Sequence, residues 1–227
     1  MKNPILVSIV IPCYNDKDYI EESVNSALRQ SYENTEIIIV DDGSNKATKK
    51  ILSSFKDRKI KIVTQENKGL SAARNVGILN ANGDYILTLD ADDFFDKSFL
   101  EKAVPVLNSN PSVGVIGCLV KCFIVKNKII FRYSPKGGDI NDFLYSNNVA
   151  ASSLFRKQCW LEAGGYDEKM RRGYEDWEFW ISVTKRNWEV YILEEFLFNY
   201  RKKENSMLQT TNLLYEEENY RYVLNKH

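Results

Sequence analysis

The stretch that decides the fold is residues 84–93, DYILTLDADD. Its first half has the length and composition of a buried strand. Apolar runs in globular proteins commonly end in a single turn residue, whereas this one delivers Asp90, Asp92 and Asp93 to one place. The stretch therefore predicts a strand of the core whose exit carries a cluster of negative charge.

The same alternation runs through the first half of the chain. Strands that are apolar on both faces and separated by helices are typical of an α/β fold, with a mostly parallel central sheet and helices on both faces. Pro12 is expected to end the first strand, and Asp18 with Glu21 resembles a capping box for the first helix. Strands are predicted at 5–11, 36–40, 59–63 and 84–89, and helices at 18–30, 45–56, 68–83 and 97–109.

The second half is less regular. A polar stretch up to about Asn148 separates its first strands from the rest. One helix is expected to begin near Glu175, and the chain ends in an amphipathic helix at 213–226. Further strands are predicted at 113–125, 128–133 and 149–155, with a short helix at 157–163.

Composition excludes several classes of protein. Lys plus Arg and Asp plus Glu both number 31, so no overall charge favours nucleic acid as a partner. The single histidine, His227, argues against a histidine-based zinc site or a Ser/His triad. The four cysteines lack CxxC spacing and are expected to be buried free thiols. No signal peptide or membrane span of roughly 18 apolar residues is recognisable, which predicts a cytoplasmic protein.

Three strand exits carry polar chemistry: residues 12–15, 41–44 and 90–93. Ligands of open α/β sheets bind beyond the carboxyl ends of the strands, so these segments predict one ligand site. Residues two apart along a strand lie on the same face, so Asp90 and Asp92 are expected to converge while Asp93 points elsewhere. Converging carboxylates without His or Cys favour Mg²⁺ or Mn²⁺, completed by substrate phosphate.

The acidic cluster has two other interpretations. Aspartates are common in turns, where they bond to the backbone. Asp90, Asp92 and Glu101 also match positions 1, 3 and 12 of a calcium-binding EF-hand loop. Phe94 and Phe95 stand where that loop needs a ligand and a glycine, so the calcium interpretation is rejected. No phosphate-binding glycine loop is present, which leaves the phosphate charge to a metal and side chains.

Six ordered motifs resemble the inverting family-2 glycosyltransferases, which have the A-type nucleotide-sugar transferase fold. They cover most of the chain from residue 5 to about 207: VSIVIPCYN, EIIIVDDGS, ENKGLSAARNVGI, GDYILTLDADD, GGYDE and GYEDWEFW. The resemblance implies a single catalytic domain at 1–207, with a nucleotide-binding half at 1–110 and an acceptor-binding half at 111–207. The C-terminal helix is assigned to 208–227.

The resemblance also implies roles on the donor side. Asp42 would accept a hydrogen bond from uracil, which favours a UDP-sugar, whereas Asp41 would have a structural role. Asp92 would bind Mn²⁺ or Mg²⁺, with Asp93 as a neighbouring alternative, and Asp90 would contact ribose or sugar hydroxyls. The other residues implied at the nucleotide site are Pro12, Tyr14 and Asn15 in the pocket, Lys68 and Arg74 at the diphosphate or sugar, and Ala91 within the DxD motif.

On the acceptor side the resemblance makes Asp176 the general base. A carboxylate opposite the leaving group would take the proton of the acceptor hydroxyl as that oxygen attacks the anomeric carbon. From the residues alone, Glu175 and Asp176 could equally be acids that open a helix. Trp177, Gly165 and Arg201 are further acceptor-side or supporting candidates, and ENSM at 204–207 resembles a segment that closes over the diphosphate.

The predicted partners are a nucleotide-sugar donor and a saccharide or lipid-linked acceptor, as in bacterial surface-polysaccharide synthesis, with no nucleic acid. Peripheral contact with the inner face of the membrane is left open. A sugar nucleotidylyltransferase is an alternative, but it needs a Gly-rich, Arg-containing loop where this chain has PCYND. A non-catalytic nucleotide- or carbohydrate-binding protein is the second alternative.

Overall fold

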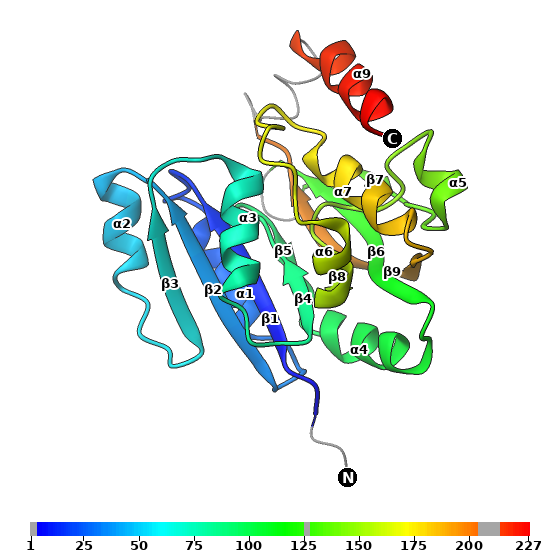
Figure 1. The fold of residues 1–227 in the computed structure, drawn as a ribbon. Coiled ribbons are helices and arrows are strands. Elements are labelled where there is room, and N and C mark those ends of the chain that lie inside the picture. Colours follow the sequence, from blue (N-terminus) through cyan, green and yellow to red (C-terminus); the bar gives the residue numbers. More distant parts are fainter. Residues whose placement is uncertain (1–3, 125–127, 204–213) are drawn as a thin grey trace.

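The structure is a computed structural model that describes residues 4–124, 128–203 and 214–227. These residues form a nine-stranded sheet in the order β3-β2-β1-β4-β8-β6-β9-β5, and β7 pairs with β6 (Figure 1). The strands are β1 (Val7–Cys13), β2 (Thr35–Asp42), β3 (Ile60–Gln65), β4 (Tyr85–Thr88), β5 (Phe94–Phe95), β6 (Val113–Phe123), β7 (Ile129–Tyr133), β8 (Leu154–Arg156) and β9 (Glu189–Arg201).

The strand directions confirm the predicted α/β class. Strands β1 to β4 are all parallel to one another. Strand β8 is antiparallel to β4 and β6, so β6 again runs in the direction of β4, and β9 is parallel to β6. Only β5, β7 and β8 run against this direction among the described strands. The carboxyl ends of β1, β2 and β4 therefore share one edge.

Helices cover both faces of the sheet, as expected from strands that are apolar on both sides. Along β1, Ile9 and Ile11 face the core under α1, α2 and α4, whereas Val10 faces the core under α3, α6 and α7 (Figure 1). The helices are α1 (Ile20–Leu28), α2 (Lys46–Leu52), α3 (Leu70–Leu79), α4 (Phe99–Ser109), α5 (Ile140–Phe143), α6 (Lys157–Ala163), α7 (Glu175–Thr184) and α9 (Glu216–Lys226).

The prediction that Pro12 ends the first strand is wrong. Strand β1 continues to Cys13, and Pro12 pairs with Val40 of β2. The Leu89 amide donates to the Val10 carbonyl, so alternate residues Val10 and Pro12 face β4. The pairing of β1 with β4 ends at Val10. A backbone N–H at position 12 would have pointed past the end of this pairing, so the strand tolerates proline, which lacks that N–H.

Some local predictions also differ from the structure. The capping box is absent, because α1 begins after Tyr19 and no side chain caps it. Helix α3 is shorter than expected at both ends. Strands β5 and β9 and the short α5 were not predicted. In β9 the adjacent exposed Glu194 and Glu195 interrupt the alternation of apolar residues that identifies a strand.

The four cysteines are free and buried, as predicted. Burial raises the pKa of the Cys13, Cys118 and Cys159 thiols to about 12, which makes them unreactive. Within the residues that the structure describes, none of the helices combines the length and apolar character required to cross a bilayer.

Candidate active site

The exits of β1 and β2 are tied together by hydrogen bonds. The Asp41 carboxylate accepts from the Ser44 amide (2.8 Å), which is a structural role as expected. The Ser44 hydroxyl accepts from the Asn15 amide (3.1 Å), and the Asn15 side chain accepts from the amide of Asn45 (2.8 Å). Asn15 adopts a left-handed conformation, φ 63°, and the side chain of Tyr14 is 51% exposed beside it. The turn thus presents Tyr14 to solvent.

Asp42 is 3% exposed, and its carboxylate is held by the β3–α3 connection. Gln65 Nε2 (2.7 Å) and the amides of Lys68 (2.8 Å) and Gly69 (2.9 Å) donate to it. A carboxylate can accept about four hydrogen bonds. These three donors therefore leave about one position for an N–H of a ligand. Lys68 is exposed near the end of the same connection.

The acidic cluster is a turn, not the continuation of β4. The strand ends at Thr88, and the Asp93 amide donates to the Asp90 carbonyl (3.2 Å). The expectation that strand alternation brings Asp90 and Asp92 together is therefore wrong. Burial is the largest cause that raises the pKa of Asp92, and the charge of Asp90 adds to it, which indicates that the two carboxylates are neighbours. Ala91 is buried between them.

The three aspartates have different partners. Asp92 forms an ion pair with Lys203 (2.7 Å). Asp93 is 2% exposed and accepts a hydrogen bond from the Arg201 amide (2.7 Å). Burial, with Asp92 and Asp90 nearby, raises the pKa of Asp93 well above its usual range. Arg201 also donates through Nε to the Asp92 carbonyl (2.8 Å), so its place is beneath the turn.

Arg74 joins the acidic turn to the start of α7. Its guanidinium is 1% exposed and donates to Asp90 Oδ1 and to Glu175 Oε1, both at 2.8 Å. It also lies 5.3 Å from the ring centroid of Tyr166. These contacts fix the DxD motif relative to the Glu175-Asp176 pair. Arg74 is thus enclosed by protein groups at the place where the sequence predicted a contact to diphosphate or sugar.

Asp176 lies in the first turn of α7 and is partly exposed. Its Oδ2 accepts a hydrogen bond from Asn147 Nδ2 (2.8 Å). Burial raises the pKa of Asp176, Arg74 opposes that shift, and Asp90 adds to it. Asp90 and Asp176 therefore act on each other electrostatically across Arg74. Burial also raises the pKa of Glu175, again opposed by Arg74.

The sequence reasoning missed Asn147, Lys203 and Asp16. Asn147 lies in the irregular segment before β8 and belongs to no recognisable motif. Lys203 Nζ contacts both Asp92 and Asp16 (3.1 Å), which are far apart in sequence. One signal could have indicated Lys203: the basic pair at 202–203 directly precedes the segment at 204–207, which the resemblance already linked to the diphosphate. Residues 204–207, predicted to close over the diphosphate, lie outside the described part of the chain.

The carboxylates of the acidic turn fit a divalent cation whose other ligands come from the substrate. The Asp92 carboxylate already holds one cation, the Lys203 ammonium, so the position is suited to positive charge. In the described ranges no group of three acidic, His or Cys side chains could enclose a metal. Mg²⁺ typically uses one or two protein carboxylates and completes its shell with phosphate and water. Asp92, with Asp90 beside it, meets that requirement.

Two acceptor-side candidates have structural partners. Gly165 follows the end of α6 at φ 84°, and a Cβ there would lie 3.0 Å from Asn75 Oδ1. The Asn75 amide in turn bonds both backbone groups of Tyr166 at 2.9 Å. Trp177 is 5% exposed and donates through Nε1 to the Phe143 carbonyl (2.7 Å). Trp177 is therefore buried and presents no free face to a sugar ring, whereas Gly165 is partly exposed.

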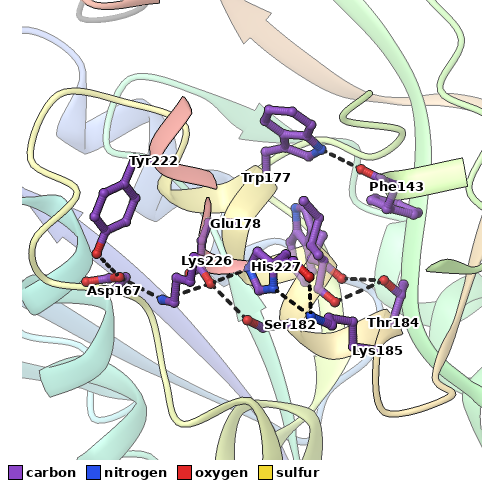
Figure 2. A network of polar contacts seen from close by, with 12 residues as sticks. Phe143, Asp167, Trp177, Glu178, Ser182, Thr184, Lys185, Tyr222, Lys226 and His227 are labelled. Carbon is purple, nitrogen blue, oxygen red and sulfur yellow. Dashed lines mark hydrogen bonds and ion pairs between the residues drawn. The ribbon is translucent and has the colours of Figure 1, made fainter. Parts of the chain in front are cut away.

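Helix α9 supports the back of α7 through a buried polar network (Figure 2). Glu178, 1% exposed, contacts Lys226 Nζ, His227 Nε2 and the Ser182 hydroxyl, each at 2.9 Å. Lys226 also reaches Asp167 (2.7 Å). The ring of Trp177 stacks on Tyr220 of α9, with centroids 5.6 Å apart. The helix that carries Asp176 is therefore fixed from both sides.

This network predicts a pH-dependent stability. Burial opposes ionisation of Glu178, but hydrogen bonds from His227, Lys226 and Ser182 outweigh it and lower its pKa. A lowered folded-state pKa gives stability that is present above about pH 4.3, the value for an unfolded glutamate, and is lost as pH falls through the folded value. Replacing Glu178 by Gln is expected to cost about 1–3 kcal/mol at pH 7 and progressively less under acid conditions.

Urea unfolding of both proteins between pH 3 and pH 8 measures this difference. Glu217→Gln is the matched control, because Glu217 lies on α9 in an exposed pair with Arg221 and such pairs contribute little. A loss at Glu178→Gln that stays constant with pH, or an equal loss at Glu217→Gln, contradicts the interpretation.

Comparisons with known proteins identify the family. A family model described as Glycosyl transferase family 2 matches residues 8–164. An uncharacterized glycosyltransferase of Haemophilus influenzae is 31% identical over 234 residues, covering 96% of this chain and 71% of that protein. S. aureus TarS 1-349 in complex with UDP-GlcNAc has a TM-score of 0.74 at 21% identity, over 91% of this chain and 61% of TarS 1-349.

A mannosyltransferase has a similar fold. PcManGT from Pyrobaculum calidifontis, in complex with GDP-Man and Mn²⁺, has a TM-score of 0.68 at 18% identity, over 92% of this chain and 60% of that one. The chain thus spans 60–71% of the three proteins it is compared with here. Likeness to the two structures shows the fold, while the family model extends over more than half of the sequence. The chain belongs to glycosyl transferase family 2.

Proposed function

We propose that the chain transfers a sugar from a UDP-sugar to a hydroxyl of a saccharide or lipid-linked saccharide, with inversion and with the help of a divalent metal. The observation that carries the proposal is the Arg74 bridge, which holds the DxD turn and the Glu175-Asp176 pair at 2.8 Å on either side of one guanidinium. Donor and acceptor groups are thereby brought into a single site. That TarS binds UDP-GlcNAc supports the choice of donor.

Asp176 is the proposed general base. Its pKa is raised by burial, and a base with a raised pKa accepts a proton more readily. Asn147 holds one of its oxygens, leaving the other for the acceptor hydroxyl. The acceptor oxygen then attacks the anomeric carbon opposite the leaving diphosphate, which gives inversion. Glu175 is engaged by Arg74 and has a positioning role.

On the donor side Asp92 would hold the divalent metal, with Asp90 beside it. When bound, the metal stabilises the negative charge that develops on the departing UDP. Asp42 offers about one free acceptor position to the N–H of uracil, and the exposed ring of Tyr14 can pack against base or ribose. The exposed Lys68 can contact the diphosphate.

Asp92→Asn tests the donor side. The variant is expected to weaken Mn²⁺-dependent UDP binding by about tenfold or more, because a neutral amide is a poor ligand for a hard cation. Calorimetric titration of UDP with and without Mn²⁺ measures the change. Asp167→Asn, an acidic residue in the α9 network, is the control. Unchanged binding of UDP to Asp92→Asn refutes the metal assignment.

The reaction itself is tested with a panel of nucleotide sugars and Mn²⁺, monitored for slow hydrolysis. A non-catalytic binding protein would bind UDP without ever cleaving a UDP-sugar. The partly exposed, Asn147-bonded carboxylate of Asp176 favours catalysis over simple binding, because binding alone requires no base. Absence of hydrolysis across the whole panel, with UDP binding intact, would favour the binding protein.

A further inference from the structure

Lys203 occupies the place where the donor site needs positive charge. Its Nζ lies 2.7 Å from Asp92 Oδ2 and 3.1 Å from Asp16 Oδ1. It also lies 5.0 Å from the ring centroid of Tyr19. The three charged side chains are 21–28% exposed, so this is a partly buried cluster and not a surface ion pair.

The chain is firmly anchored just before Lys203. Arg201 donates its backbone amide to Asp93 (2.7 Å) and its Nε to the Asp92 carbonyl (2.8 Å). Its guanidinium also pairs with Glu22 and lies 4.6 Å from the ring centroid of Phe123. The end of β9 is therefore fixed beneath the acidic turn, and the short distance along the chain directs Lys203 to Asp92. The contact follows from the fold.

We propose that Lys203 is a resident counter-cation of the donor site, which competes with the divalent metal for Asp92 until the nucleotide diphosphate binds. This inference rests on the proposed metal-dependent function. An ammonium at 2.7 Å neutralises the carboxylate that the metal requires. Two cations on one carboxylate repel each other, so metal and Lys203 exclude one another while no phosphate is present.

Binding of the diphosphate is expected to end the competition between Lys203 and the metal for Asp92. The negative charge of the diphosphate favours metal binding at Asp92 and offers the displaced ammonium a new partner. Arg74 is less suited to this part, because its guanidinium is 1% exposed and two of its nitrogens are bonded to Asp90 and Glu175. The free protein is consequently expected to bind divalent metal weakly, and metal and nucleotide to bind together.

The test is a titration of the nucleotide-free protein with Mn²⁺, following the electron paramagnetic resonance signal of the free ion. Lys203→Met keeps most of the side-chain volume but removes the charge, and is expected to tighten Mn²⁺ binding by about tenfold or more. Lys203→Arg keeps the charge and is expected to bind as weakly as the wild type. Lys202→Met is the matched control, since Lys202 is an exposed neighbour and its loss changes net charge equally.

Every outcome decides the proposal. Tighter binding in Lys203→Met alone supports it. Equal tightening in Lys202→Met would show a general charge effect and overturn it, as would unchanged or undetectable Mn²⁺ binding in Lys203→Met with an intact thermal melt. Should Lys203→Met melt at a lower temperature, Lys203→Gln is titrated in its place under the same criteria.

The titration contains no nucleotide sugar, so it can fail independently of the proposed function. If the wild-type protein transfers sugar but Lys203→Met gains no Mn²⁺ affinity, the proposed function stands and the inference about Lys203 is wrong. If the protein transfers no sugar but its Lys203→Met variant binds Mn²⁺ more tightly, the inference about Lys203 is supported and the proposed reaction is wrong.

Discussion

Asp176→Asn is expected to lower kcat by about 10²–10⁴-fold, the usual contribution of a general base. The asparagine amide has the shape of the carboxylate and can keep the contact to Asn147, which is 2.8 Å long in the unmodified protein. It cannot accept the proton of the acceptor hydroxyl. UDP affinity is expected to change by less than about twofold, because the proposed nucleotide contacts lie on other elements. Steady-state kinetics with a transferable donor, together with calorimetry of UDP, measures both quantities.

The Glu217→Gln variant is the control for this result. It removes a carboxylate from an exposed ion pair with Arg221 on α9, away from the proposed site, so kcat is expected to stay near the wild-type value. If Asp176→Asn lost activity and UDP affinity to the same degree, Asp176 would belong to the nucleotide pocket and the base would have to be found elsewhere.

Much of the fold could be predicted from local patterns. The strands at 5–11 and 36–40 are near-continuous apolar runs, and such runs indicate buried strands without knowledge of their partners. The site at the carboxyl ends followed from the same reasoning, because parallel strands share an edge. The structural role of Asp41 in its turn was expected and is confirmed.

The rest depends on contacts between distant segments. Arg74 bonds to Glu175, which is 101 residues later, and Lys203 pairs with Asp16, 187 residues earlier. No local pattern specifies such partners. Strand β9 was missed because its pairing with β6 contains register shifts and its middle carries two exposed glutamates. The acidic turn was misread as strand because alternation was extended past Thr88, where the backbone folds back.

Arg74→Met is expected to destabilise the protein by about 3–5 kcal/mol, because removing one member of a buried ion pair leaves an unpaired charge. Glu175 is the group most affected, since both it and Arg74 are less than 10% exposed. Activity should fall as well. Arg74 counteracts the burial that raises the pKa of Asp176, so its loss raises that pKa further. If Asp176 is the general base, it works as a carboxylate, above its pKa, and the acid limb of the pH–rate profile should therefore move to higher pH.

The double variant Arg74→Met/Glu175→Gln separates positioning from folding. It removes the unpaired charge with its partner, and buried pairs can be replaced by neutral groups at little cost in stability. The double variant is thus expected to regain most of the lost free energy of unfolding, as a double-mutant cycle by urea denaturation would show. It should not regain activity, because nothing then joins the Asp90 turn to α7. If Arg74 only bound diphosphate, its loss would raise the KM for donor, leave the pH profile in place and show no coupling to Glu175.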